Sequence, residues 1–481
     1  MGSRDRGILL SYGKIIVNMV CGLLLSVVLL RLLGDTEYGI YQTVSAFAGY
    51  LVLLEFGMGT VMVRNLSACR GENANPAALQ RQVGTIWSMT GVCCLLIGAT
   101  AVVFYCLMPL LYTHSMTMAQ IVHGQEIFLL ITGHVVLSFL AQTAGGVLLA
   151  MEYYSFSAAE GIVRTVARVV VLLAALCIHP DARYVAAADF LLSGISLLVT
   201  MVYCRQKAGL RLSFGKIDPA IARAAVPLAA AVFLQAIVNQ AYHNVDKFLI
   251  GVMLDPESVA VYSVGLYIFG VFSSLTTVTI SMYGPEIVQK HTKREELLPH
   301  LVRPCRLTAV VGGMVLFGFL AAGRQFISVL YGAAYAQSWP IALLLMGSMY
   351  PNAVNGVLVN VLDAENKRMG RSLILLLTTA MNVVLTVFWL RQWGIVGAVL
   401  ATTVSTIVGQ VVLGNWYYHK ALGISLEKLY VQTFRGVLLW LTLGGVVGLG
   451  IGLAMGESFL SMLVSGGVFL LCCLPIVRKI R

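Results

Sequence analysis

Fourteen long apolar runs determine what this chain can fold into. Each is long enough to cross the hydrocarbon core of a bilayer, which takes about 20 residues of helix. Within lipid, a run of this length satisfies its backbone polar groups as a helix. The predicted spans are residues 8–33, 39–62, 84–108, 124–150, 157–178, 184–203, 222–252, 259–284, 305–330, 338–362, 370–391, 394–418, 430–453 and 458–477. They nearly fill the 481 residues, so the sequence predicts an all-α polytopic membrane protein of about 14 transmembrane helices.

Composition supports this class and argues against others. The chain is 59% hydrophobic and 11% charged, whereas soluble domains carry about 25% charged residues. The net charge of +11 does not indicate a nucleic-acid partner, because the cations lie in short loops between apolar runs. That placement is typical of contact with membrane lipids. The ten cysteines include no C-x-x-C pair, which favours packing over metal ligation, and we expect no cofactor.

The distribution of cations predicts the orientation. With the N-terminus placed inside, most of the 32 Lys and Arg residues fall in alternate loops on the inner side. Both termini are then predicted to be cytoplasmic.

A basic loop near 204–222 divides six predicted spans from eight. Gly146-Val147-Leu148 before this loop matches Gly356-Val357-Leu358 after it, six spans further on. We therefore expect two six-helix lobes, residues 1–206 and 222–420, and two additional helices in 428–481. Parallel repeats are common in transporters, where the substrate site lies between the halves.

One charged stripe stands out within the predicted fifth span. Glu160, Arg164 and Arg168 are spaced four residues apart and share a helix face. A charge at the middle of a bilayer costs about 2.5–3.5 kcal/mol on insertion scales, so it normally faces a protein interior or a wet cavity. We interpret the stripe as the wall of a polar cavity. A structural alternative has Glu160 neutralising Arg164 and Arg168 pairing with an acid on a neighbouring helix.

Three further polar residues in the first lobe are candidates. Lys14 and Asn18 lie one turn apart on the first span, where Lys14 either lines the cavity or extends to the inner interface. Glu55 is predicted to pair with Arg164, and the alternative is a carboxylate that titrates with protons. It precedes Phe56-Gly57, where a small residue permits a tight contact or a bend.

The seventh span supplies the candidates of the second lobe: Asn239, Asp246 and Lys247. Uncharged amides suit sugar hydroxyls, and they also serve as hydrogen-bonded contacts between helices. Pro227 and Pro351 are expected to bend the seventh and tenth spans.

Small residues mark the thirteenth span. Gly444, Gly448 and Gly452 lie on one face, which indicates close helix packing, with a groove for a lipid chain as the alternative.

Catalytic signatures are missing from the sequence. There is no Walker A motif, and the short outer loops offer few acids for a glycan-joining enzyme. We therefore expect a protein that is not an enzyme.

Several motifs resemble one family. Arg31-Leu-Leu-Gly-Asp-Thr-Glu-Tyr-Gly-Ile-Tyr41, Leu54-Glu55-Phe56-Gly57-Met58-Gly59 and Val245-Asp246-Lys247-Phe248-Leu249-Ile250-Gly251 resemble polysaccharide-transport flippases, the Wzx-like branch of the MOP superfamily. Glu55 stands where that family more often has Asp. The resemblance implies a bacterial cytoplasmic-membrane protein that flips undecaprenyl-diphosphate-linked oligosaccharides between leaflets by alternating access, for cell-surface polysaccharide biosynthesis.

The same resemblance implies partners and a site. Arg164 and Arg168, with Lys14, would bind the diphosphate, because a guanidinium matches phosphate oxygens in a planar fork. The partners would be the lipid-linked oligosaccharide, membrane lipids, and the polymerase and assembly proteins of the polysaccharide. The flippase would be a monomer whose two lobes form a V-shaped cavity, driven by the membrane potential or by a proton or sodium gradient. The alternatives are a cation-coupled multidrug or metabolite antiporter of the same superfamily, with Asp189 or Glu55 as ion site, and a membrane scaffold.

Overall fold

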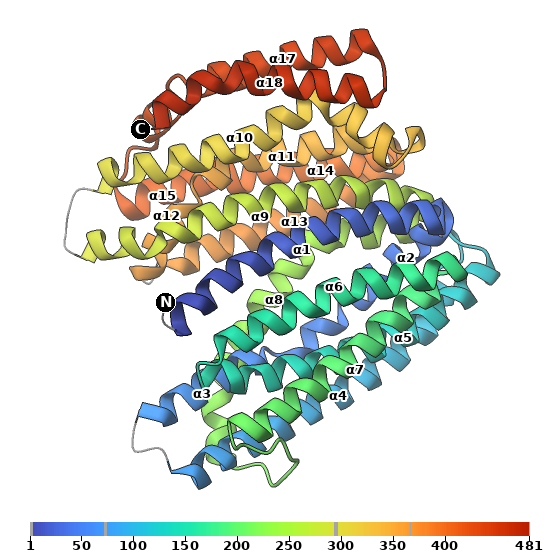
Figure 1. Cartoon of the computed structure of the whole chain (residues 1–481), viewed down its shortest axis with the longest axis vertical. Coiled ribbons are helices and arrows are strands. Elements are labelled where there is room, and N and C mark those ends of the chain that lie inside the picture. Colours follow the sequence, from blue (N-terminus) through green and yellow to red (C-terminus); the bar gives the residue numbers. More distant parts are fainter. Residues whose placement is uncertain (1–2, 72–74, 293–296, 366, 481) are drawn as a thin grey trace. The chain divides into compact units, whose positions relative to one another are not determined.

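A computed structural model describes residues 3–71, 75–292, 297–365 and 367–480, and these form helices joined by short turns (Figure 1). Contacts divide the chain into two units, Met1–Ala260 and Val261–Arg481. Twelve helices of the described residues are long and apolar enough to cross a membrane, and a bent pair makes a thirteenth. The first predicted span lies in helix α1, Ser3–Leu33, which includes the apolar segment Val17–Leu33. The predicted all-α polytopic fold is thereby confirmed.

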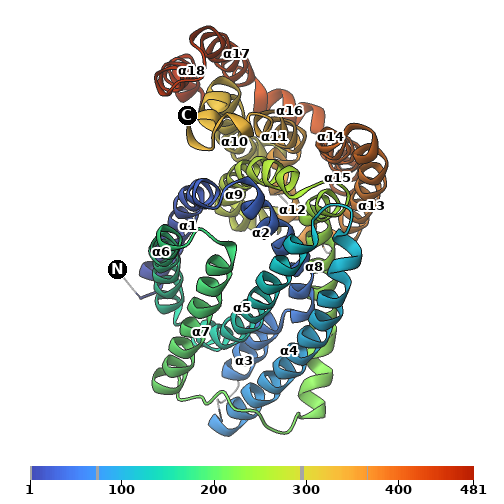
Figure 2. The same cartoon turned by 90° about the vertical axis from the view of Figure 1, so that its right-hand side faces the viewer.

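The first unit contains eight α-helices and one 3-10 helix among its described residues. They are α1, α2 (Asp35–Ala48), η1 (Leu51–Glu55), α3 (Met58–Gly71), α4 (Pro76–Tyr112), α5 (Met118–Ala150), α6 (Tyr154–Ile178), α7 (Ala182–Lys207) and α8 (Pro219–Met253). Helix α1 packs along α6, and α5 packs along α7 (Figure 2). Helix α8 belongs to this unit because it packs on α2, α3, α4 and η1. The lobes predicted from the sequence remain a prediction.

The division between the units falls within α9 (Pro256–Thr292), and the second unit contains most of this helix and the helices that follow. They are α10 (Leu297–Leu330), η2 (Ala333–Tyr335), α11 (Ser338–Val354), α12 (Gly356–Ala364), α13 (Arg368–Trp393), α14 (Ile395–Thr406), the π-helix η3 (Ile407–Leu413), α15 (Gly414–Leu422), α16 (Leu426–Phe434), α17 (Leu438–Met455) and α18 (Phe459–Ile480). Helices α11 and α12 meet at a bend of 44°, close to Pro351, as expected. The predicted span 430–453 is shorter than expected, because α16 is a separate helix that packs on α10.

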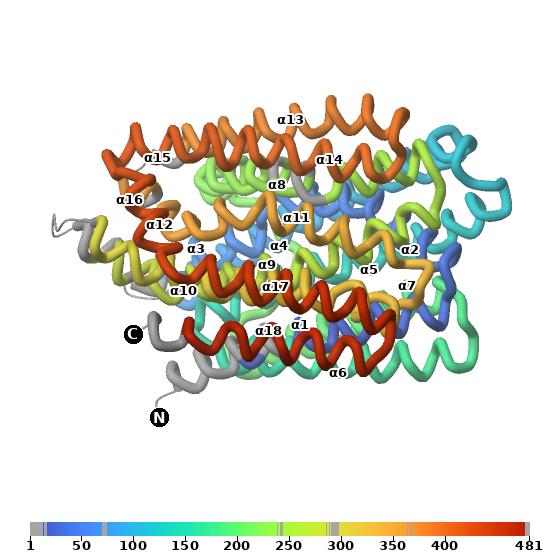
Figure 3. Tube along the Cα trace, turned by 90° about the horizontal axis from the view of Figure 1, so that it is seen from above, coloured from blue at the N-terminus to red at the C-terminus, as the bar shows by residue number. Residues whose placement is uncertain are grey.

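The glycine face of α17 is a packing surface. Helices α17 and α18 run side by side (Figure 3) and both contact α10. A Cβ on Gly444 would lie 3.1 Å from Phe469, and one on Gly448 would lie 2.6 Å from Ala321. Neighbouring helices therefore occupy the face, as the packing interpretation predicted, and leave no groove for a lipid chain at these positions.

The basic loop before α8 is fixed to α4. The Gln80 side chain donates to the Arg211 carbonyl at 2.6 Å and accepts from the Arg211 amide at 2.9 Å. About two turns further along α4, the Ser88 hydroxyl makes the same pair of bonds with the Gly215 carbonyl and amide, at 3.1 and 2.9 Å. Polar side chains of α4 thus satisfy the backbone of an irregular segment that has no helical bonds of its own.

Candidate functional site

The centre of the candidate site is an ion pair between α6 and α7. The Arg168 guanidinium donates from Nε to Asp189 Oδ1 at 2.5 Å and from Nη2 to Oδ2 at 2.8 Å. The arginine side chain is 37% exposed and the aspartate side chain 11% exposed. Two parallel bonds from a planar fork are the strongest form of this interaction. The structural alternative predicted this kind of pairing, with an acid on a neighbouring helix.

A polar cluster supports Asp189 from α5. His134 Nδ1 lies 3.0 Å from the Asp189 carbonyl oxygen and 2.8 Å from Ser193 Oγ. Ser138 Oγ lies 2.9 Å from Ser193 Oγ. Since a carbonyl oxygen can only accept, the first of these contacts places the imidazole proton on Nδ1. Sequence reasoning did not single out His134, Ser138 and Ser193, although the first two lie one turn apart on one helix.

The rest of the predicted stripe separates into different environments. Glu160 accepts a hydrogen bond from Ser196 of α7 at 2.6 Å. The predicted neutralisation of Arg164 by Glu160 is therefore wrong, because α7 offers the carboxylate a closer partner. Arg164 is exposed and has no hydrogen bond or ion pair with any residue that the structure describes.

Helix α1 brings one more candidate to this face. Thr165, which follows Arg164, donates from Oγ1 to Asn18 Oδ1 at 2.6 Å. Asn18 itself is exposed. Lys14 lies in α1, one turn before Asn18, but its side chain lies outside the described residues.

Glu55 lies at a break within a membrane span. The break consists of η1 and of Phe56 and Gly57, whose φ angles of 47° and 63° are left-handed. A Cβ on Gly57 would lie 2.3 Å from Val232 of α8, so glycine is required both by φ and by space. Glu55 forms no ion pair with Arg164, contrary to prediction, and it has no partner within the described parts of the chain. Of the two predicted outcomes, the tight contact is confirmed at Gly57, and the helix is interrupted at this position.

The candidates on α8 form separate contacts. Asn239 is exposed and accepts a bond from Gln235 at 3.2 Å. Lys247 donates from Nζ to Gln42 of α2 at 3.4 Å. Asp246 is 4% exposed. No hydrogen bond or ion pair between described residues joins these three to the Arg168–Asp189 pair, so the structure does not gather all predicted residues into one cluster.

Comparisons with known proteins decide the family. The family model for polysaccharide biosynthesis proteins matches residues 5–289, which is more than half of the chain. The chain belongs to this family. The predicted relationship to a polysaccharide family is thereby confirmed.

Similarity to individual family relatives is low. The chain is 21% identical over 180 residues to the probable low-salt glycan biosynthesis flippase Agl15 of Haloferax volcanii. The match covers 36% of this chain and 38% of that relative, so the chain spans well under half the length of the curated relative it matches.

Solved structures show the same fold over almost the whole chain. The lipid II flippase MurJ in its inward closed conformation superposes with a TM-score of 0.72 at 14% identity, over 98% of this chain and 99% of that one. The eukaryotic MATE transporter AtDTX14 superposes with a TM-score of 0.60 at 12% identity, over 90% and 98%. At this identity the likeness concerns the fold alone.

Proposed function

We propose that this protein flips an undecaprenyl-diphosphate-linked oligosaccharide from the inner to the outer leaflet of the bacterial cytoplasmic membrane. The family supports a role in polysaccharide biosynthesis, and both Agl15 and MurJ are named as flippases. The role is transport and not catalysis, and the cargo serves cell-surface polysaccharide biosynthesis.

The unpaired guanidinium of Arg164 carries the proposal. Asp189 already neutralises Arg168, whereas Arg164 keeps its full charge on an exposed face of a membrane-spanning helix. A positive charge at this depth is costly unless something anionic or wet meets it. A diphosphate group offers several acceptor oxygens that match the guanidinium fork. Arg164 would therefore bind the head group, while the Arg168–Asp189 pair keeps α6 in place beside it.

The remaining steps follow the family's transport scheme. Two lobes would alternate between inward-open and outward-open states while the lipid tail stays in the bilayer. Lys14, Asn18 and Arg168 would complete the head-group site, and the amide of Asn239 with the charged Asp246 and Lys247 would line the path of the glycan. A proton or sodium gradient would drive the cycle. The chain would act as a monomer with cytoplasmic termini, next to the polymerase and assembly proteins that use its product.

A leaflet assay tests the role of Arg164. The full chain is reconstituted in liposomes containing a polyprenyl-diphosphate oligosaccharide with a dye on the sugar, and dithionite added outside reports the dye that has moved outward. We expect Arg164→Ala to lower the flipping rate at least tenfold with an unchanged melting temperature, because no described partner is lost. Arg391→Ala, which removes another exposed arginine, is the matched control and should flip normally. Normal flipping by Arg164→Ala would remove the proposed site.

One observation favours the antiporter alternative. Glu55 is a carboxylate without a described partner at a helix break, and such intramembrane acids are candidates for ion sites. If the chain is an antiporter, proteoliposomes should expel small organic cations when a sodium or proton gradient is applied, and Glu55→Gln should abolish this. Efflux without movement of the labelled lipid would replace the flippase proposal.

A further inference from the structure

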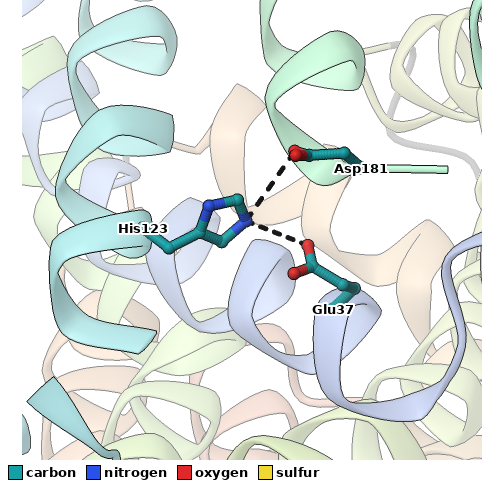
Figure 4. A group of neighbouring side chains, drawn as sticks. All are labelled: Glu37, His123 and Asp181. Atoms are coloured by element: carbon teal, nitrogen blue, oxygen red, sulfur yellow. Dashed lines mark hydrogen bonds and ion pairs between the residues drawn. The ribbon is translucent and has the colours of Figure 1, made fainter. Parts of the chain in front are cut away.

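Three side chains from distant parts of the first unit converge at the ends of their helices. Glu37 lies in the first turn of α2, His123 in the second turn of α5, and Asp181 caps α7 (Figure 4). His123 Nε2 lies 3.0 Å from Glu37 Oε2 and 3.7 Å from Asp181 Oδ1. One ligand atom from each residue lies within 4.8 Å of the others. All three residues adjoin loops that the charge pattern predicts to face outward.

These distances fit a small divalent ion. Zinc binds imidazole nitrogen and carboxylate oxygen at about 2.0–2.2 Å, so ligands of a tetrahedral site lie about 3.3–3.5 Å apart. The distances from His123 Nε2 fall on either side of this range, and the two carboxylate oxygens lie within 4.8 Å of each other, so side-chain movements would bring the three atoms onto one ion. Calcium prefers six to eight oxygen ligands, which a site containing imidazole does not match.

The local charge also favours a cation. The Arg183 guanidinium donates to Asp181 at 2.7 Å and to Glu126 at 2.9 Å, and the Glu37 carboxylate lies next to His123, which also contacts Asp181. Three carboxylates outnumber the two basic side chains, Arg183 and His123, so the group carries an excess of negative charge whether or not His123 is protonated.

Neighbouring backbone groups hold both carboxylates in position. The Arg183 amide donates to Asp181 Oδ1 at 2.7 Å, and the Ala182 amide lies 3.4 Å from Glu37 Oε2. Hydrogen bonds to metal ligands, from groups that do not bind the metal themselves, orient those ligands and are part of a functioning site. They leave Glu37 Oε2 and Asp181 Oδ1 directed at the same imidazole nitrogen, as Figure 4 shows.

We propose that Glu37, His123 and Asp181 bind a divalent transition-metal ion, with zinc the best match, and with solvent at the fourth position. The ion would join the starts of α2 and α7 to the second turn of α5. His123 lies 86 residues after Glu37, and α7 begins 145 residues after it. Binding to the folded state alone stabilises it by mass action. The site is independent of the transport proposal, since it uses none of the residues assigned to the head group.

Zinc titration of the purified full chain in detergent, after chelator treatment, tests the site. We expect one zinc ion per chain and a melting temperature that rises with zinc and not with magnesium. His123→Gln and Glu37→Gln should each weaken zinc binding about 100-fold or more. Losing even a hydrogen bond to a metal ligand costs about 10–100-fold in affinity, and losing the ligand itself should cost at least as much. The matched control is His179→Gln, which removes an exposed histidine from the loop before α7; it should bind as the wild type does.

Two further measurements keep the test decisive. His123→Cys supplies a different zinc ligand at the same position, so it should restore binding if the glutamine variant fails for lack of a ligand and not for lack of folding. The cobalt-loaded protein should show no thiolate charge-transfer band, which excludes the ten cysteines as ligands. Binding that survives in both His123→Gln and Glu37→Gln, or a chain that takes up no zinc, would overturn the proposal.

Discussion

The Arg168–Asp189 pair offers the most informative perturbation, because its two partners differ in burial. The carboxylate is 11% exposed and the guanidinium 37% exposed. Removing the arginine leaves the more deeply buried charge without its cationic partner. Removing the aspartate charge leaves a guanidinium that is partly exposed and so less costly to leave unpaired. Breaking a buried pair by removing one partner costs about 3–5 kcal/mol, whereas an exposed pair contributes about 1 kcal/mol or less.

The expected costs follow from this asymmetry. Arg168→Met should lower the free energy of unfolding by about 3–4 kcal/mol, near the range for a buried pair. Asp189→Asn should cost about 2 kcal/mol, since the remaining charge is partly exposed. The double variant should return to within about 1 kcal/mol of the wild type, because neither charge is left alone.

The measurement is unfolding in mixed micelles by sodium dodecyl sulfate, followed by tryptophan fluorescence for the wild type and three variants. Equal costs for the two single variants would contradict the argument from burial. Additive costs in the double variant would show that the two groups do not stabilise each other. A folded double variant that fails to flip the labelled lipid would show that the Arg168 guanidinium also contacts the cargo.

Two further outcomes are expected. Gly448→Ala should destabilise the chain, because its Cβ would lie 2.6 Å from α10, whereas Gly450→Ala, with no atom within 4 Å, should be neutral or slightly stabilising by helix propensity; thermal melting compares them. Hydrogen bonds from Ser328 and Arg324 hold the pKa of Glu457 below its ordinary value, so this contact stabilises the fold above about pH 4.5 and is lost as the pH falls through the lowered value. At pH 7, Glu457→Gln should therefore have a free energy of unfolding lower than that of the wild type, by about 1 kcal/mol or less for so exposed a pair. In acid the two proteins should be equally stable.

The helices were predictable because lipid imposes a simple requirement on length and polarity. A run of about 20 apolar residues has few alternatives to a helix in a bilayer, and each of the fourteen predicted runs corresponds to helical chain. The bend beside Pro351 and the break at Gly57 were also visible as residue types. The boundary of α16 was missed, because Leu426–Phe434 is apolar enough to read as the start of the following span.

The partners of the charged residues were not predictable to the same degree. Helical spacing shows which residues share a face, but it does not show which neighbouring helix that face meets. Glu160 and Arg164 are spaced for an ion pair, yet Ser196 of α7 binds Glu160 instead. Asp189 was noted as an intramembrane acid, and only the packing of α7 against α6 identifies it as the partner of Arg168.

Two acids of the first unit are bound to partners between α6 and α7, and this bears on how an anionic cargo could be handled. Asp189 and Glu160 both bind groups across the α6–α7 interface, which leaves neither to neutralise Arg164. A second acid close to Arg164 would compete with a diphosphate for the same guanidinium donors, since both present carboxylate- or phosphate-type oxygens to one fork. Because Glu160 and Asp189 are held at the α6–α7 interface while Arg164 stays unpaired among the described residues, α6 is kept in place without closing the position that the head group would need.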